Sequence, residues 1–277
     1  MEDFRDQFRQ HGYAVVEGAI PTAALRSIQA AAQRIVAAFD PDLHRTVFTT
    51  RNQDHAQDRY FLDSAEGVHC FLEEEAVDGE GRLLRDKELA VNKIGHALHD
   101  LVPEFHDFCR QEAIARTLRA IGMDAAELWQ TMYIFKQPGI GGEVRWHQDA
   151  SYLQTSPPSV VGLWVAVENA TRDNGCLWLQ PGGHRSPLRE VYRVDHRTGT
   201  GALHPLDPAP WPQSGEAIAL EVPAGSLVAF SDYMPHYSST NRSDRSRQAF
   251  TMHFAPPGVQ WLDDNWLQRR RLPSFVV

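Results

Sequence analysis

The sequence predicts a mainly β domain, either a β-sandwich or a jelly roll, with helices packed on one side. Two observations predict this class. Apolar residues at helical spacing occupy the first half of the chain, whereas after about residue 127 the apolar runs become short, branched or aromatic, and separated by Gly, Pro, Asn and Asp. About nine such runs are too many and too short for a doubly wound sheet with crossover helices.

The helices are expected mainly within residues 1–122. Segment 21–39 begins with a proline and repeats apolar residues every three or four positions, as an amphipathic helix does. Segment 101–122 continues this pattern and ends at Gly122, a residue type suited to a helix C-terminus. Between them, residues 44–87 are polar and lack sustained periodicity, which predicts an irregular excursion and a candidate flap.

The strands are expected mainly within residues 127–255, which would form the jelly-roll core. Asn174-Gly175 is a strong turn signal between two of them. Residues 194–215 are a long insertion rich in Pro and Gly and a second candidate lid. The whole chain, 1–277, is expected to form one domain. The predicted strands are 13–18, 128–137, 143–150, 160–169, 175–181, 216–222, 225–231, 235–241 and 246–254.

Composition and charge exclude several classes of protein. The 277 residues are 42% hydrophobic and 23% charged, as in globular domains. A net charge of −9 gives no basic footprint, so no nucleic-acid partner is expected. No apolar run is long enough for a membrane helix and the charged N-terminus does not resemble a signal peptide, so we expect a soluble, cytoplasmic protein without membrane insertion.

The three cysteines are Cys70, Cys109 and Cys176. They are far apart and odd in number, which indicates neither a disulfide framework nor a thiolate zinc site. We expect them to be small core residues in a reducing compartment.

One His-x-Asp sequence, with His147 and Asp149, lies in the predicted strand 143–150. Because alternate residues of a strand point to the same face, the imidazole and the carboxylate could bind one metal ion. With thirteen histidines in the chain this signal is weak alone. A third ligand is available at His236, which follows the apolar strand 225–231. Two imidazoles and one carboxylate form the facial triad that suits non-haem Fe(II) and leaves coordination positions open.

An arginine, Arg247, follows His236 by eleven residues in a predicted strand. Its planar guanidinium is suited to pair with a carboxylate, such as the far end of a keto acid that chelates the metal. Arg245 would share the same strand face, so the residues leave both arginines open as the partner.

These residues and their surroundings resemble the Fe(II)/2-oxoglutarate dioxygenases of the phytanoyl-CoA dioxygenase (PhyH) family. The resemblance is greatest to the subgroup called phytanoyl-CoA dioxygenase domain-containing proteins. The similarity covers roughly residues 10–255 and rests on the segments NKIGHALHDL, MYIFKQP, GGEVRWHQDASYLQT, GLWVAVENATRDNGCLWLQPGGH and NRSDRSRQAFTMHF. The resemblance implies a double-stranded β-helix core, a cupin-like jelly roll, buttressed by the N-terminal helices.

The resemblance also implies three metal ligands and five residues that bind the cosubstrate. The ligands, which are the catalytic residues, are His147, Asp149 and His236. The cosubstrate-binding residues are Lys93, Met132, Trp164, Ser238 and Arg247. On composition alone, the lysine is also compatible with a solvated helix, and the methionine and tryptophan with a simple core role.

The implied reaction uses Fe(II), 2-oxoglutarate and O₂, with ascorbate as a candidate reductant, and releases succinate and CO₂. Related halogenases have a small residue in place of Asp149, so hydroxylation or another oxidation of a C–H bond is favoured. Gln148 and residues 150–152, next to the motif, are candidates for substrate contacts.

The substrate would be a small organic or lipid-like molecule. The net charge and the lack of an obvious Lys/Arg cluster argue against a nucleotide-phosphate handle, and the sequence specifies neither a CoA thioester nor the oligomeric state. The alternative function is a non-catalytic jelly-roll protein that binds metal or 2-oxoglutarate as a sensor.

Overall fold

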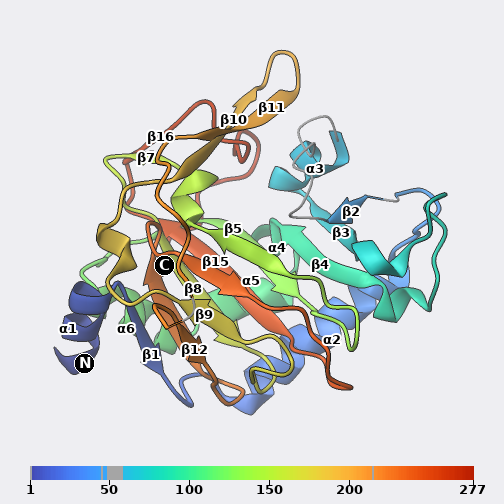
Figure 1. Ribbon diagram of the computed structural model, residues 1–277, viewed down its shortest axis with the longest axis horizontal. Helices are drawn as coiled ribbons and strands as arrows, with labels where there is room; N and C mark the ends of the chain where they lie inside the picture. Colours follow the sequence, from blue (N-terminus) through green and yellow to red (C-terminus); the bar gives the residue numbers. More distant parts are fainter. Residues whose placement is uncertain (1, 45, 49–58, 214) are drawn as a thin grey trace.

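The computed structural model describes residues 2–44, 46–48, 59–213 and 215–277. Two sheets form the centre of the molecule, and helices cover the outer face of the larger one (Figure 1). The larger sheet has eight strands in the order β1-β13-β8-β15-β5-β4-β3-β2, and the smaller has four in the order β12-β9-β14-β6. Neighbouring strands are antiparallel, except for the parallel pair β2 and β3. This arrangement confirms the predicted jelly roll with helical support.

The described helices and strands have these bounds. The helices are α1 Glu2–His11, α2 Thr22–Ala38, α3 Arg59–Asp63, α4 Leu98–Leu101, α5 Pro103–Cys109 and α6 Glu112–Ala120. The strands are β1 Tyr13–Val16, β2 Val47–Phe48, β3 Val68–Glu73, β4 Val91–His96, β5 Glu127–Ile134, β6 Val144–His147, β7 Thr155–Ser156, β8 Val161–Ala166, β9 Leu177–Leu179, β10 Glu190–Asp195, β11 Thr200–Pro205, β12 Ile218–Leu220, β13 Leu227–Ser231, β14 His236–Ser238, β15 Ala249–Ala255 and β16 Gln260–Trp261.

The predicted helix over 101–122 is wrong as one continuous element, because the segment contains the end of α4, then α5 and α6. The chain leaves the helical conformation at Val102, whose φ of −127° and ψ of 114° are extended. A residue that precedes proline is sterically disfavoured in a helix, which explains this break. A second break falls at Gln111, and Gly122 then ends the segment with a φ of +93°.

The outer face of the large sheet carries most of the apolar core. Side chains of β8, β15 and β5 alternate between the two faces. Leu163 and Phe250 point outward with their alternate neighbours and pack against α2 and α5. Each fully buried side chain of this kind stabilises the fold by about 1.5–3 kcal/mol. This stabilisation offsets the free energy that burying polar side chains on the inner face, turned toward the small sheet, costs the fold.

The two predicted irregular segments contain regular structure. In 44–87, β3 is a strand of the large sheet and pairs with β4 over its length. In 194–215, the last residues of β10 and all of β11 form a hairpin that projects from the sheets (Figure 1). Residues 45, 49–58 and 214, parts of the two candidate lids, lie outside the described residues.

All three cysteines are buried and free, in agreement with their predicted core role. Among the described helices, none has both the length and the apolar content that crossing a bilayer requires.

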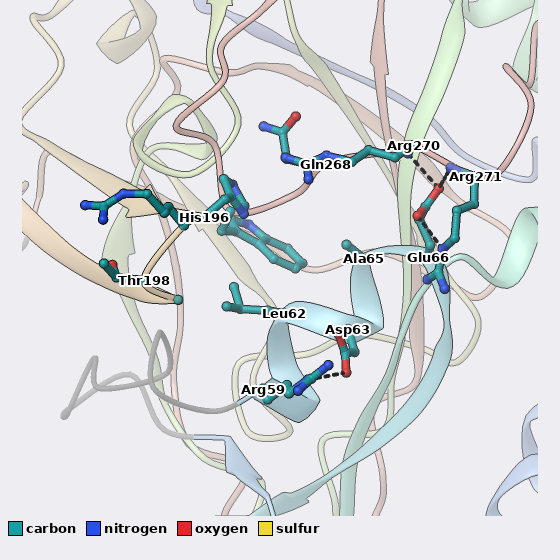
Figure 2. Close-up of a pocket in the computed structure, with 13 residues that line it drawn as sticks. Arg59, Leu62, Asp63, Ala65, Glu66, His196, Thr198, Gln268, Arg270 and Arg271 are labelled. Atoms are coloured by element: carbon teal, nitrogen blue, oxygen red, sulfur yellow. Dashed lines mark hydrogen bonds and ion pairs between the residues drawn. The ribbon is translucent and has the colours of Figure 1, made fainter.

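One carboxylate, that of Glu66, holds residues 270–272 of the C-terminal segment. Glu66 accepts hydrogen bonds from the backbone N–H groups of Arg270, Arg271 and Leu272, and from the Arg271 side chain (Figure 2). Burial opposes ionisation of Glu66, but these hydrogen bonds outweigh it and lower its pKa to about 2. The segment therefore depends on an ionised carboxylate.

The substitution Glu66→Gln tests this attachment. Because the folded-state pKa lies below the ordinary value of 4.5, the ionised form stabilises the fold above that value, and this contribution is lost as the pH falls toward about 2. We expect the variant to lose about 1–3 kcal/mol of unfolding free energy near neutral pH. Denaturant unfolding should show the difference from wild type shrinking as the pH falls below about 4.5.

The control is Glu112→Gln, which removes an exposed ion pair with Arg119 and should cost at most about 1 kcal/mol. Equal losses in the two variants, or a Glu66→Gln loss that does not change with pH, would contradict this assignment.

Candidate metal and cosubstrate site

Three side chains with metal-binding atoms converge between the two sheets. His147 ends β6 and His236 begins β14, and the two residues are partners in the register of these strands. Oδ1 of Asp149 lies 3.8 Å from Nε2 of His147 and 3.6 Å from Nε2 of His236. Neighbouring ligands about 2.1 Å from one metal ion lie about 3 Å apart, so each of these two distances needs to shorten by less than about 1 Å. All three ligand atoms lie within 4.8 Å of one another. The set fits a metal ion.

The backbone reaches this geometry in a different way from the predicted one. Strand β6 ends at His147, and Asp149 begins a 3₁₀ turn, Asp149–Ser151, so the two ligands do not share a strand. Gln148 between them has φ −118° and ψ 138°, which is extended and continues the alternation of the side chains. Asp149 therefore still lies on the side of His147, as the spacing predicts.

The side chain of Gln148 supports the scaffold. It is fully buried, and its Nε2 donates to the carbonyl oxygens of Pro187 and Tyr233. Its Oε1 accepts the backbone N–H of Arg189. The substrate contact expected for Gln148 is therefore wrong, because its polar atoms are used by the backbone.

Both histidines are held in the tautomer that metal binding needs. Nδ1 of His147 donates to the carbonyl oxygen of Arg145, and Nδ1 of His236 donates to that of Met234, each over 2.9 Å. The Nε2 lone pairs are then free for a metal ion. Burial and the neighbouring His236 lower the pKa of His147 to about 3, so its ring is neutral at physiological pH.

A fourth side chain, His253, binds the carboxylate from the other side and was missed by the sequence analysis. His253 lies on β15, and its Nε2 is 3.2 Å from Oδ2 of Asp149. Burial alone would raise the pKa of Asp149, but His253 and His236 outweigh it and hold this pKa well below the usual range. The alternation that begins at Arg247 passes through Thr251 to His253, and this pattern could have found the residue.

Gly162 on β8 makes room for the same carboxylate. It is the register partner of His253. A Cβ atom at Gly162 would lie 3.1 Å from Oδ2 of Asp149 and 2.8 Å from the ring of Phe230. Any larger residue would push the carboxylate out of its position.

Three of the predicted cosubstrate residues, Lys93, Met132 and Trp164, lie on strands of the large sheet, whereas Ser238 lies on β14 of the small sheet. Thr251 on β15 is the register partner of Trp164 on β8 and of Met132 on β5. Lys93 on β4 is the register partner of Ile134 on β5, two residues after Met132. It is only 6% exposed, which excludes the interpretation of Lys93 as a solvated helix residue. Burial lowers the pKa of Lys93 to about 7, against the opposing effect of Glu73.

Arg247 lies two residues before β15 and only 3% of it is exposed. Its Nε donates to the carbonyl oxygen of Gly175 over 3.0 Å, and its Nη2 lies 3.2 Å from Oγ of Ser238. Its guanidinium carbon is 5.6 Å from the centre of the Trp164 ring. The side chain of Arg245 is 72% exposed, so the geometry favours Arg247 as the carboxylate partner.

Arg247 is a buried cation in need of an anion. Burial lowers its pKa to about 10, so it stays charged at neutral pH. No carboxylate among the described residues forms an ion pair with it, and its Nη1 has no hydrogen-bond partner there. Leaving a buried charged donor unpaired costs at least about 1–3 kcal/mol. A bound carboxylate would remove this cost.

A separate hollow of about 650 Å³ lies between α3, the tip of the β10–β11 hairpin and the C-terminal segment (Figure 2). No predicted site residue lines it, but four arginines do, namely Arg59, Arg197, Arg270 and Arg271. No obvious Lys/Arg cluster was found in the sequence, whereas the fold brings Arg59 and Arg197 to the consecutive residues Arg270 and Arg271 from distant segments. Three of the four form ion pairs, with Asp63, Asp195 and Glu66.

Comparisons with known proteins identify the family of this chain. Residues 8–249 match the family model described as phytanoyl-CoA dioxygenase (PhyH). The chain is 38% identical over 274 residues to the phytanoyl-CoA dioxygenase of Arabidopsis thaliana, covering 98% of this chain and 95% of that protein. It is also 38% identical over 270 residues to the phytanoyl-CoA dioxygenase domain-containing protein 1 of Bos taurus, covering 95% of this chain and 92% of that protein.

A solved structure shares the fold at lower identity. The epimerase SnoN, in complex with Fe³⁺, alpha ketoglutarate and nogalamycin RO, superposes with a TM-score of 0.64 at 14% identity, covering 98% of this chain and 90% of that one. This likeness supports the jelly-roll architecture.

Metal binding by the three convergent side chains can be measured directly. In an EPR titration of the protein with Mn(II), we expect one ion per chain. His147→Ala and His236→Ala should each weaken Mn(II) binding by more than about 100-fold. Loss of a residue that only hydrogen-bonds to a metal ligand weakens binding by about 10- to 100-fold, and loss of a ligand itself should cost more. The matched control is His106→Ala, an exposed histidine on α5. Wild-type affinity in a ligand variant, or an equal loss in the control, would show that the ion binds elsewhere.

Proposed function

The chain belongs to the phytanoyl-CoA dioxygenase family, a family of iron- and 2-oxoglutarate-dependent oxygenases, and from this premise we propose what its site does. The protein uses Fe(II), 2-oxoglutarate and O₂ to oxidise a C–H bond of a small organic or lipid-like substrate, most simply by hydroxylation, and releases succinate and CO₂. One observation carries the proposal: two imidazole nitrogens and one carboxylate oxygen converge beside a buried arginine that has no anionic partner among the described residues.

In this proposal, His147, Asp149 and His236 hold the iron. The bound iron, with its cosubstrate and O₂, supplies the oxidant that breaks the C–H bond. The protein orients both imidazoles through their Nδ1 hydrogen bonds. The low pKa of His147 keeps that ring neutral, and the lowered pKa of Asp149 keeps the carboxylate ionised. These ligands need no rearrangement of the backbone before the metal binds.

Arg247 binds the distal carboxylate of 2-oxoglutarate in this proposal, and Nη1 is the donor available for it. Ser238 contacts Arg247 and orients it, while its own Oγ donates to the carbonyl oxygen of Gly175. Met132 and Trp164 form apolar walls, and Lys93 adds a buried amine that can be charged near neutral pH. Thr251 lies between these walls, and its buried Oγ1 has no hydrogen-bond partner among the described residues, which makes it a further candidate contact.

The substrate is expected to reach the iron from the side of Tyr152. The ring of Tyr152 lies 6.2 Å from that of His147 and 5.9 Å from that of Tyr192, between centroids. Both tyrosines belong to an apolar cluster with Trp266 and Phe61. Such a lining excludes water from a reactive centre and favours a substrate with an apolar part.

The proposed activity is tested without knowledge of the primary substrate. Incubation with Fe(II), ascorbate, O₂ and 2-oxoglutarate should form succinate slowly by uncoupled turnover, and His147→Ala should form none. Succinate is quantified by mass spectrometry against a reaction from which iron is omitted. If the wild-type protein binds metal and 2-oxoglutarate but forms no succinate with any candidate substrate, a non-catalytic sensor is the better account.

The role of Arg247 has a matched control in Arg245. Arg247→Gln removes a charge-assisted hydrogen bond and should raise the KM for 2-oxoglutarate by at least about tenfold. Arg245→Gln should leave this KM unchanged, because its side chain is mostly exposed. The unfolding midpoints of both variants, compared with that of the wild-type protein, show whether a change in KM comes from lost binding or from a destabilised fold. A large effect at Arg245 with none at Arg247 would reverse the assignment.

A further inference from the structure

We propose that His253 is a positioning residue that limits Asp149 to one metal bond, through Oδ1, and so preserves the open coordination positions of the iron. The inference rests on the proposed function, because it assumes that the metal binds at His147, Asp149 and His236. It assigns a role to a buried histidine on β15 that is not itself a ligand.

The two oxygens of Asp149 have different surroundings. Oδ1 faces the metal site, at 3.6–3.8 Å from the two imidazole nitrogens that have lone pairs available. Oδ2 faces the large sheet, and its hydrogen-bond partner among the described residues is Nε2 of His253, at 3.2 Å. The carboxylate is thus already divided between a metal-facing oxygen and a sheet-facing oxygen.

His253 must be the donor in this hydrogen bond. A carboxylate binds a metal ion in its ionised form, and that form can only accept hydrogen bonds. Nε2 of His253 therefore carries a proton. Its Nδ1 is buried and has no partner among the described residues. The bond to Asp149 is therefore the one hydrogen bond of the His253 ring among the described residues.

The donor is fixed by the sheet that carries it. His253 is 4% exposed and lies on β15 between β5 and β8, where Gln130 and Gly162 are its register partners. The missing side chain at Gly162 leaves the space that Oδ2 occupies. Rotation of Asp149 to bring both oxygens toward the metal would break the bond to His253 and leave the buried Nε2–H group of His253 unpaired.

The number of metal bonds made by Asp149 matters for the proposed reaction. Three protein ligands leave three positions of an octahedral ion open, which is the number that a bidentate keto acid and O₂ require. A second bond from Asp149 would leave only two. By holding Oδ2, His253 would keep the third position available without contacting the iron or the cosubstrate.

The experiment uses the full-length protein and four variants of two residues. His253→Phe removes the donor, His253→Gln returns an amide N–H near the position of Nε2, and His253→Asn carries an amide that is too short to reach it. Gly162→Ala displaces Oδ2 while leaving His253 in place. Mn(II) affinity is measured by EPR titration, and the coordination number is read from the absorption spectrum of the Co(II) protein before and after addition of 2-oxoglutarate.

We expect His253→Phe, His253→Asn and Gly162→Ala to weaken Mn(II) binding by about 10- to 100-fold. His253→Gln should keep most of the wild-type affinity. In the Phe variant, 2-oxoglutarate should bind the Co(II) protein at least about tenfold more weakly, because one position is lost. The Gln and Asn comparison keeps the inference testable if the Phe variant does not fold.

Wild-type Mn(II) affinity and Co(II) spectra in His253→Asn would overturn the inference, and so would equal defects in the Gln and Asn variants, which would indicate packing alone. The proposed function fails in a distinguishable way, since the wild-type protein itself would then bind no Mn(II), or would bind it with unchanged affinity in His147→Ala.

Discussion

The arrangement of the site depends on one constraint, the burial of an ionised carboxylate between two sheets. Asp149 is only 7% exposed, and a carboxylate in an apolar interior without partners would be strongly destabilised or protonated. Three histidines surround it, one each from β6, β14 and β15. The pairing of β6 with β14, the glycine on β8 and the polar inner face of β15 all follow from the need to accommodate this anion.

The opposite charge is buried nearby in the same interior. Arg247 has hydrogen bonds to a backbone carbonyl and to Ser238 but no carboxylate partner among the described residues, so the empty protein bears the cost of a desolvated cation. A second cost comes from Lys93, whose amine is buried in β4. The aromatic and aliphatic core between the large sheet and the helices offsets both. Residues on one face of a strand thus stabilise the fold, while their neighbours on the other face provide chemistry.

Local patterns in the sequence were sufficient for much of this architecture. Alternation in 246–254, the turn at Asn174-Gly175 and the helical spacing in 21–39 each have a local physical cause, and the structure confirms them. The resemblance named the residues that now converge, although the sequence did not show that Asp149 follows the end of β6.

Other features depend on contacts between distant segments, which no local pattern contains. Strand β3 lacks a clear alternation in its own sequence, and its pairing partners β4 and β2 come from other segments of the chain. The contact between His253 and Asp149 spans 104 positions, and the arginines of the basic hollow come from three separate segments. Local patterns could mark individual residues in these features, but the contacts between them became visible only when the sheets were assembled.

The most direct measurement of the central claim is an anaerobic crystal structure with Fe(II) and 2-oxoglutarate, with data collected at the iron absorption edge. The account predicts one anomalous peak bonded to Nε2 of His147, Nε2 of His236 and Oδ1 of Asp149, with Oδ2 still on His253 and the distal carboxylate of 2-oxoglutarate at Arg247. An iron peak elsewhere, or a cosubstrate whose distal carboxylate lies away from Arg247, would contradict it.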